Sequence, residues 1–382
     1  MIPYGKQFIE QDDIDAVVSV LKGTHLTQGQ TVRDFEQAIC EYTGAKYCLA
    51  VANGTAALHI AVAALDLPVG TEGITSPITF VATANSMLYC GVKPVFVDID
   101  SLSYCLATEK IEKQINSHTK LIMPVHFAGQ VCDMKKINKI AEEHSCYVIE
   151  DAAHAIGSNY ADGSKVGNCK YSDMTIFSFH PVKTITTGEG GAVTTNDKAL
   201  YEKLCTLRSH GITSDPAKMT QCPRPSFYEM HSLGFNYRMT DIQAALGLSQ
   251  LKKLEKLKES RRRIIEIYNK ELCGINGLIL PFERKGLDSC FHLYVIKIDF
   301  KRLGKSRREV MEEFKAKGVL TQVHYTPVYT QPYYQKELAY KWGDHPKTEA
   351  YYEQCLSIPL YPTMTDEEIQ IVINAIKDII KI

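Results

Sequence analysis

Residues 177–192 read FSFHPVKTITTGEGGA. This stretch begins as an apolar strand, places Ser178, His180 and Lys183 near the end of that strand, and continues through a turn rich in threonine and glycine. Ligands of open α/β sheets bind at the carboxyl ends of the strands. Lys183 lies there among few other charges, and partial desolvation would lower the pKa of its amine and favour the neutral nucleophile. The stretch therefore predicts a strand end that carries a reactive lysine.

Short apolar runs alternate with helical patterns on both sides of this stretch, from about residue 45 to residue 196. Most runs are apolar at consecutive positions, as in strands that are covered on both faces. The candidate strands are 47–53, 93–100, 120–128, 146–151, 175–180 and 191–196, with helices between them such as 55–65 and 133–144. The alternation predicts an α/β fold with a mainly parallel sheet between layers of helices.

A smaller α+β unit is predicted after the sheet. Residues 241–272 form one long helical pattern that opens with a capping box of Thr240 and Gln243, and its length suggests an arm between domains. The elements expected beyond it are strands at 291–299 and 320–325, a helix at 306–318 and a closing helix at 365–382. We therefore divide the chain into an N-terminal segment with a large domain (1–245) and an interdomain helix with a small domain (246–382).

Composition narrows the class of protein. The 382 residues carry 43 Lys and Arg against 44 Asp and Glu, a net charge of -1, which argues against nucleic acid or an anionic membrane as partner. The 12 cysteines form no CxxC pair, so we expect reduced thiols and no metal site. We see no signal peptide and no apolar run near the roughly 18 residues of a membrane span. We expect a soluble, cytoplasmic protein.

A carboxylate complements the lysine. Asp151 ends the run CYVIED, and a carboxylate at the end of a buried strand is costly to desolvate unless something pairs with it. A protonated pyridine nitrogen is one such partner, and a neutral Lys183 can condense with an aldehyde. Both features are those of a pyridoxal phosphate site.

Two further pieces could complete such a site. In VANGTAALH (51–59), Asn53 would cap a helix whose first amides, at Thr55 and Ala56, face a phosphate. Phe80 follows another strand end and could stack on a flat ring. Each piece alone has an ordinary interpretation, as a cap, a surface lysine or a core residue. Together they supply a phosphate cradle, a ring stack, a partner for the ring nitrogen and a lysine for the aldehyde.

In these segments the chain resembles the sugar aminotransferases of the DegT/DnrJ/EryC1/StrS family, a branch of the fold-type I pyridoxal phosphate enzymes. The resemblance extends over nearly the whole length and includes EDAAHAIGS (150–158), RSHGI (208–212) and GFNYRMTDIQAALGLSQL (234–251). It implies a seven-stranded, mainly parallel sheet in a large domain, with a smaller C-terminal α+β domain.

The resemblance also implies roles for individual residues. Lys183 and Asp151 would be catalytic, the lysine by its Schiff base with the cofactor. The cofactor would be bound by Thr55, Ala56, Phe80, Asp151, His154, Ser178, Lys183 and Asn236, the last from the other subunit of a homodimer with shared active sites. The substrate side would be lined by His210, Tyr237, Arg238, His324 and Tyr325. Ordinary packing remains the alternative for His210 and His324, and a structural ion pair for Arg238.

Within the family, FSFHPVKTITT, FAG (127–129) and VHYTPVY (323–329) most resemble the aminotransferases of pseudaminic acid biosynthesis. That resemblance implies transfer of an amino group from L-glutamate to C4 of UDP-2-acetamido-2,6-dideoxy-β-L-arabino-hex-4-ulose. The product would be UDP-4-amino-4,6-dideoxy-N-acetyl-β-L-altrosamine.

Three alternatives remain. The enzyme could aminate a GDP- or dTDP-linked keto sugar instead, or the chain could be a catalytically silent, regulatory protein that binds the cofactor. A nicotinamide dehydrogenase is disfavoured, because no GxGxxG follows a strand and the glycine cluster at 188–191 leads into a strand.

Overall fold

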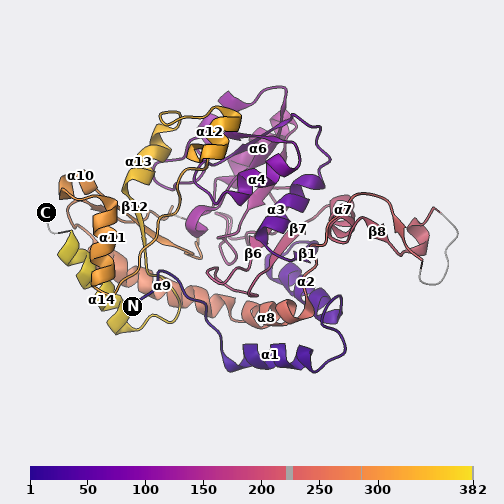
Figure 1. Cartoon of the computed structure of the whole chain (residues 1–382), viewed down its shortest axis with the longest axis horizontal. Helices are drawn as coiled ribbons and strands as arrows, with labels where there is room; N and C mark the ends of the chain where they lie inside the picture. The colour runs from indigo at the N-terminus through magenta and orange to yellow at the C-terminus, as the bar shows by residue number, and fades with distance from the viewer. Residues whose placement is uncertain (221–226, 285, 381–382) are drawn as a thin grey trace.

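A seven-stranded sheet forms the centre of the molecule (Figure 1). The computed structural model describes residues 1–220, 227–284 and 286–380. The strands run in the order β1-β7-β6-β5-β4-β2-β3, and those from β3 to β6 are parallel, whereas β7 is antiparallel to both of its neighbours. Their bounds are Tyr47–Val51 (β1), Glu72–Thr75 (β2), Lys93–Phe96 (β3), Thr119–Met123 (β4), Tyr147–Asp151 (β5), Met174–Ser178 (β6) and Gly191–Thr195 (β7). The predicted α/β class with a mainly parallel sheet is confirmed.

Helices cover both faces of this sheet, which explains why its strands are apolar at consecutive positions. In β4, for example, Leu121 and Met123 belong to the apolar cluster on one face, and Ile122 belongs to the cluster on the other. The first face carries α3 (Gly54–Ala63), α4 (Ala82–Tyr89) and α7 (Lys198–Arg208). The second carries α2 (Gln30–Thr43), α6 (Met134–His144) and α8 (Asp241–Leu251).

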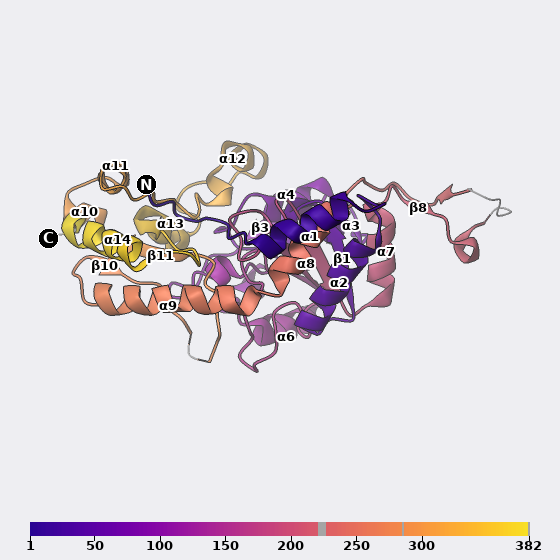
Figure 2. The ribbon, with the colours of Figure 1, turned by 90° about the horizontal axis from the view of Figure 1, so that it is seen from below.

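A second, three-stranded sheet lies at one end of the molecule, and the β8–β9 hairpin projects from the other end (Figure 2). The small sheet has its own apolar cluster, built with residues of α9, α11 and α14. The remaining elements are α1 (Gln11–Leu21), α5 (Thr108–Ile111), β8 (Ile212–Thr213), β9 (Glu229–Met230), α9 (Leu254–Leu272), β10 (Leu278–Ile279), β11 (Tyr294–Ile298), α10 (Phe300–Leu303), α11 (Arg307–Ala316), α12 (Pro332–Leu338), α13 (Pro346–Gln354), β12 (Cys355–Ile358) and α14 (Asp366–Ile379), with short 3₁₀ turns between. The division of the chain at residue 245 stays a prediction.

The predicted single helix over 241–272 is wrong, because the chain breaks it into α8 and α9. At the break, the Lys253 amide donates to the Gln250 carbonyl at 3.0 Å, a bond from residue i to i−3 that tightens the turn. The Lys253 side chain is only 9% exposed, and its Nζ lies 2.9 Å from Asp13 in α1. Packing against α1 therefore accompanies a change of direction that the helical pattern does not reveal.

The predicted strand at 320–325 is also wrong. Its pairing is limited to an isolated bridge between Gln322 and Ser357, after which the chain turns towards the large sheet. One strand of the large sheet, β2, was not predicted from the sequence, because its short run EGIT contains a glycine and reads as a turn. The closing helix ends as α14, and residues 381–382 of the predicted span lie outside the described residues.

No helix in the described ranges has the length and apolar character that a membrane crossing would require.

Candidate active site

A cavity of about 880 Å³ opens where the strands of the large sheet end. Asp151 ends β5, Ser178 ends β6, and Asn53 follows β1, so the cavity lies at the edge where sequence reasoning placed the ligand. Ten predicted site residues line it, namely Thr55, Ala56, Phe80, Asp151, His154, Ser178, Lys183, Tyr237, His324 and Tyr325. Segments far apart in the sequence therefore converge on one space.

The amine of Lys183 is prepared to react as a neutral nucleophile. Burial lowers the pKa of Lys183 to about 8, and the charge of Asp151 opposes that shift. Within the described part of the chain, Nζ takes part in no hydrogen bond. The fraction of free base at a given pH is therefore larger than for an exposed lysine, as the sequence predicts.

Asp151 presents its carboxylate to the same space in one fixed orientation. It is 4% exposed, and its Oδ2 accepts a hydrogen bond of 2.7 Å from Thr83 Oγ1. Its Oδ1 accepts from the Ala153 amide at 3.1 Å, and Thr83 is steadied by Thr79 at 2.7 Å. Sequence analysis missed Thr83, which lies in the first turn of α4, whereas Thr79 lies before that helix.

The first turn of α3 forms an anion cradle against the end of β6. Asn53 caps the helix, since its Oδ1 accepts from the Ala56 amide at 2.8 Å. A Cβ added at Gly54 would lie 2.9 Å from Ser178 Cβ, so only glycine permits this approach. The Thr55 side chain is exposed at the same turn. Hydroxyls and helix amides at a positive helix end suit a phosphate.

The aromatic ring of Phe80 is exposed beside these groups. Phe80 is 59% exposed although it is large and apolar, and its ring centroid lies 6.3 Å from that of Tyr325. An exposed ring at the wall of a cavity can stack on a planar ligand.

His154 is neutral, with its proton on Nε2. Its Nδ1 accepts from the Ala128 amide at 3.3 Å, so Nε2 carries the hydrogen and donates to the Tyr325 hydroxyl at 3.2 Å. Burial first, then the charges of Lys183 and His324, hold the pKa of His154 well below its usual value. The hydrogen of the Tyr325 hydroxyl is left available for a ligand.

His324 and Tyr237 complete the predicted part of the wall. His324 Nδ1 lies 2.7 Å from Ser357 Oγ, and burial together with the charge of Lys183 lowers the pKa of His324 to about 3. The Tyr237 hydroxyl lies 3.1 Å from His59 Nδ1. Each of these two predicted substrate-side residues therefore has a polar side-chain group that is oriented by a hydrogen bond to a second residue.

Three predicted residues do not line this cavity: Asn236, His210 and Arg238. Ser209 bridges to Asn236, and Arg238 bridges to Val51, so all three lie where the chain joins the projecting hairpin to the sheet (Figure 1). Asn236 and His210 are exposed. His210 and Arg238 are thus outside the cavity of their own chain, whereas Asn236 was predicted to act from a second subunit and its role stays a prediction.

Other lining residues were not predicted, among them Tyr4, Tyr89, Glu189 and His292. Tyr4 comes from the N-terminal segment and His292 from the chain two residues before β11, so no local pattern ties either to the residues around Lys183. Their place in the wall depends on how distant segments pack.

These groups fit pyridoxal phosphate. Lys183 offers an amine for the aldehyde, Asp151 a carboxylate for the ring nitrogen, and α3 a cradle for the phosphate, while Phe80 offers a face for the ring. No group of three or more His, Cys, Asp or Glu side chains in the described residues is arranged to hold a metal ion.

Comparison with known proteins agrees with this geometry. Residues 7–377 match the DegT/DnrJ/EryC1/StrS aminotransferase family. The chain is 42% identical over 379 residues to the uncharacterized protein MJ1066 of Methanocaldococcus jannaschii, covering 99% of this chain and 97% of that one. It is 39% identical over 381 residues to the spore coat polysaccharide biosynthesis protein SpsC of Bacillus subtilis, covering 100% and 97%.

Solved structures are similar over the same length. PseC of Helicobacter pylori, an aminotransferase involved in the biosynthesis of pseudoaminic acid, superposes with a TM-score of 0.92 at 33% identity, covering 100% of this chain and 99% of that one. The PLP-form of the putative sugar aminotransferase Spr1654 of Streptococcus pneumoniae gives 0.91 at 28%, covering 100% and 98%, and its PMP-form gives 0.92 at 28%, covering 100% and 99%.

Proposed function

The chain belongs to the DegT/DnrJ/EryC1/StrS aminotransferase family, and we propose that it transfers an amino group from L-glutamate to C4 of UDP-2-acetamido-2,6-dideoxy-β-L-arabino-hex-4-ulose. As a member of that family it is a sugar aminotransferase that uses pyridoxal phosphate. The observation that carries the proposal is the convergence of Lys183, Asp151 and the first turn of α3 on one cavity. A silent regulatory protein would not need that reactive amine.

Pyridoxal phosphate, when bound, supplies an aldehyde for the amino group and a ring that accepts electrons from the α-carbon of the donor. Lys183 Nζ would hold the aldehyde, and once released it would carry the proton from the α-carbon of the donor to C4′ of the cofactor, acting as base and then as acid. A pKa of about 8 suits both directions of this transfer near neutral pH. Asp151, oriented by Thr83 and Ala153, would keep the ring nitrogen protonated.

The proposed sugar substrate is supported by the sequence identity to PseC and by the volume of the cavity. The identity to PseC is 33%, compared with 28% to Spr1654. A cavity of about 880 Å³ is at the upper end of the range for ligand sites, which suits a cofactor together with part of a nucleotide sugar. The 39% identity to SpsC favours a second candidate, an aminotransferase for another nucleotide-linked keto sugar that is destined for a polysaccharide.

A homodimer with shared sites is part of the proposal. Of the described residues that line the cavity, Lys183 is the only Lys or Arg, so one chain offers little positive charge to the diphosphate of a nucleotide sugar. Arg238, His210 and Asn236 lie outside their own cavity, at the base of a hairpin with an exposed Leu233 (80%). A second copy related by two-fold symmetry would bring these residues to the site.

A two-stage experiment tests the function. The holoenzyme is mixed with L-glutamate, and the visible absorbance of the cofactor is expected to change as the amino group is taken up. Keto sugars linked to UDP, GDP and dTDP are then added separately, and the UDP-linked 4-keto sugar is expected to restore the absorbance with the highest kcat/KM. A higher value for another sugar would favour the second candidate, and no change with any amino donor would contradict transamination.

A further inference from the structure

His292 is held rigidly at the wall of the cavity. It lies two residues before β11, where its amide donates to the Ala128 carbonyl at 3.0 Å and its own carbonyl accepts from Arg261 at 3.3 Å. The side chain is 4% exposed and lines the cavity, with its ring centroid 4.4 Å from that of His154. Anchors on both sides therefore fix the ring beside a residue that contacts Tyr325.

The imidazole of His292 lacks a hydrogen-bond partner. Its Nδ1 is buried without one, and across the described ranges neither ring nitrogen takes part in a hydrogen bond. Burial is the main cause that holds the pKa of His292 well below its usual value, and the charges of His154, Lys183, Arg261 and His324 add to it. The ring is therefore neutral, with one N–H to donate and one nitrogen to accept. Nδ1 is enclosed, so Nε2 is the nitrogen that a ligand in the cavity can reach. Polar groups in such sites are normally paired, and the lack of a partner for Nε2 in the described residues indicates a ligand contact.

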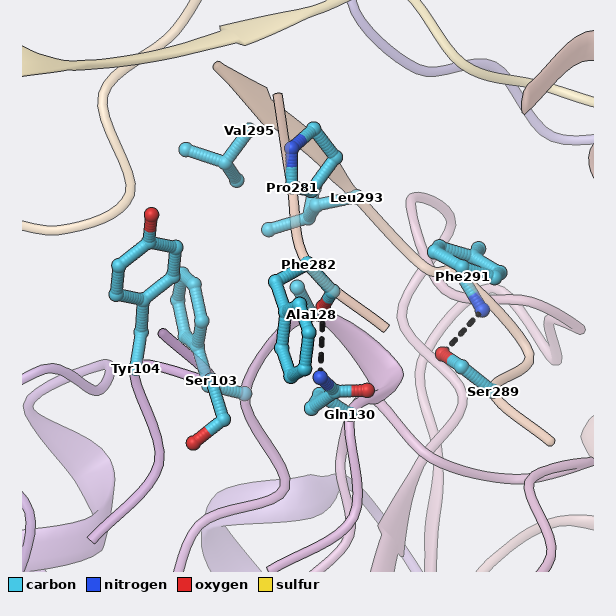
Figure 3. A pocket seen from close by; sticks show the side chains of 11 residues that line it. Ser103, Tyr104, Ala128, Gln130, Pro281, Phe282, Ser289, Phe291, Leu293 and Val295 are labelled. Carbon is cyan, nitrogen blue, oxygen red and sulfur yellow. Dashed lines mark hydrogen bonds between the residues drawn. The ribbon is translucent and has the colours of Figure 1, made fainter. Parts of the chain in front are cut away.

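The neighbours of His292 in the chain lie in a different space. Phe291 and Leu293 line a second, small cavity behind Ala128 (Figure 3). That cavity measures about 20 Å³, and Gln130 spans it by donating to the Phe282 carbonyl at 2.7 Å. It has room for about one water molecule and for no substrate. The small cavity lies among the residues that support the wall of the large cavity, whereas the imidazole of His292 lines the large cavity itself.

Two different substrates use that large cavity in turn. The amino donor brings an α-carboxylate close to Lys183, and the keto sugar brings hydroxyl groups to the same place. An arginine there would bind the carboxylate well but would remain as an uncompensated buried charge beside the sugar. A neutral imidazole N–H can donate to either group, so it suits a site that must accept both.

We propose that His292 donates a hydrogen bond to the α-carboxylate of the amino donor, and to a sugar hydroxyl when the keto sugar takes its place. The inference rests on the proposed function and deepens it by naming how one site recognises both substrates.

The test measures binding without turnover by calorimetry on the holoenzyme. One ligand is 2-methyl-L-glutamate, which has no hydrogen on its α-carbon. The other is 4-amino-4-methylpentanoate, in which a methyl group replaces the α-carboxylate. In His292→Phe, which keeps a flat ring against His154, the first ligand is expected to bind about tenfold or more weakly, because a hydrogen bond to a charged group is lost. Binding of the second ligand is expected to stay within about twofold.

Two variants serve as controls. His292→Gln keeps an N–H and is expected to recover most of the affinity for 2-methyl-L-glutamate. His345→Phe removes another buried imidazole, 7% exposed, that does not line the cavity, and it is expected to leave the ratio of the two affinities unchanged. If His292→Phe does not fold, the same ratio is read from His292→Asn, whose N–H lies nearer the backbone and is expected to recover little.

Equal weakening of both ligands in the His292 variants would mean a structural role and would overturn the inference, as would unchanged binding of both. Failure of the proposed function looks different, because the wild-type holoenzyme would then show no absorbance change with L-glutamate.

Discussion

Lys183 owes its chemistry to its surroundings more than to its position in the chain. An exposed lysine is almost fully protonated at neutral pH, whereas burial in this cavity brings the pKa of Lys183 to about 8. Asp151 limits the shift, since its negative charge stabilises the ammonium form. Asp151 therefore tunes the amine that is proposed as the nucleophile, in addition to its proposed role as partner of the ring nitrogen.

Replacing Lys183 by Ala should lower transamination by at least about a thousandfold, because both the covalent anchor and the proton carrier are lost. Turnover is measured with L-glutamate and the keto sugar, and borohydride treatment should give a lysine-linked cofactor adduct only in the wild type. Lys93→Ala, at a residue whose side chain is 53% exposed, is the control and should leave both results unchanged. Normal turnover in Lys183→Ala would refute the assignment.

The pKa of Lys183 predicts how the cofactor-free protein takes up pyridoxal phosphate. Only the neutral amine attacks an aldehyde, so the rate of uptake should rise with pH and level off above a pH of about 8. The charge of Asp151 raises the pKa of Lys183, so Asp151→Asn should shift this profile to lower pH. Stopped-flow absorbance against pH measures the midpoint, and a shift to higher pH in Asp151→Asn would contradict the role given to that charge.

At the scale of elements, the site depends on how closely α3 approaches β6. The helix is capped by Asn53, and its first turn lies against Ser178 because Gly54 has no side chain. Gly54, Thr55 and Ala56 of that turn then line the cavity together with Ser178. Both the cap and the close approach depend on residues of the motif NGT (53–55), so this part of the site is predictable from local sequence.

Gly54→Ala should separate α3 from β6 and weaken the binding of pyridoxal phosphate by about tenfold or more, since the new Cβ would lie 2.9 Å from Ser178 Cβ. Equilibrium dialysis of the cofactor measures the loss. Gly5→Ala is the matched control, because a Cβ at Gly5 meets nothing within 4 Å, and it should bind as the wild type does. Equal affinity in Gly54→Ala and the wild type would show that the close approach is not needed.

At the scale of the whole molecule, the β8–β9 hairpin extends away from both sheets and carries apolar side chains into solvent (Figure 2). Met230 and Leu233 are exposed there, and Asn236 and Arg238 follow at its base. An exposed apolar projection suits an interface better than a free surface. The proposed dimer would cover it and would complete each cavity with residues from the second copy.

Mixing two damaged variants tests the shared site. Arg238→Ala should raise KM for the nucleotide sugar, and Lys183→Ala should be inactive. If Arg238 acts in the cavity of the other copy, a heterodimer of the two variants has one intact site, so refolding an equal mixture should recover about a quarter of the wild-type activity at low substrate. Each variant refolded alone is the control. No recovery above the controls, or a monomer in light scattering, would contradict the shared site.

Local sequence determined much of this protein. Consecutive apolar residues marked the strands because both faces of the sheet are covered, and the motifs around Asn53, Asp151 and Lys183 each end a strand, so they had to meet at one edge. Four features depended on the tertiary structure: the break between α8 and α9 at Lys253, the lack of a strand over 320–325, the ring nitrogen of His154 that carries the proton, and the position of His292 in the cavity wall. Each of these depends on contacts between segments distant in the chain, such as Ala128 with His292, and such contacts come from packing that no local pattern encodes.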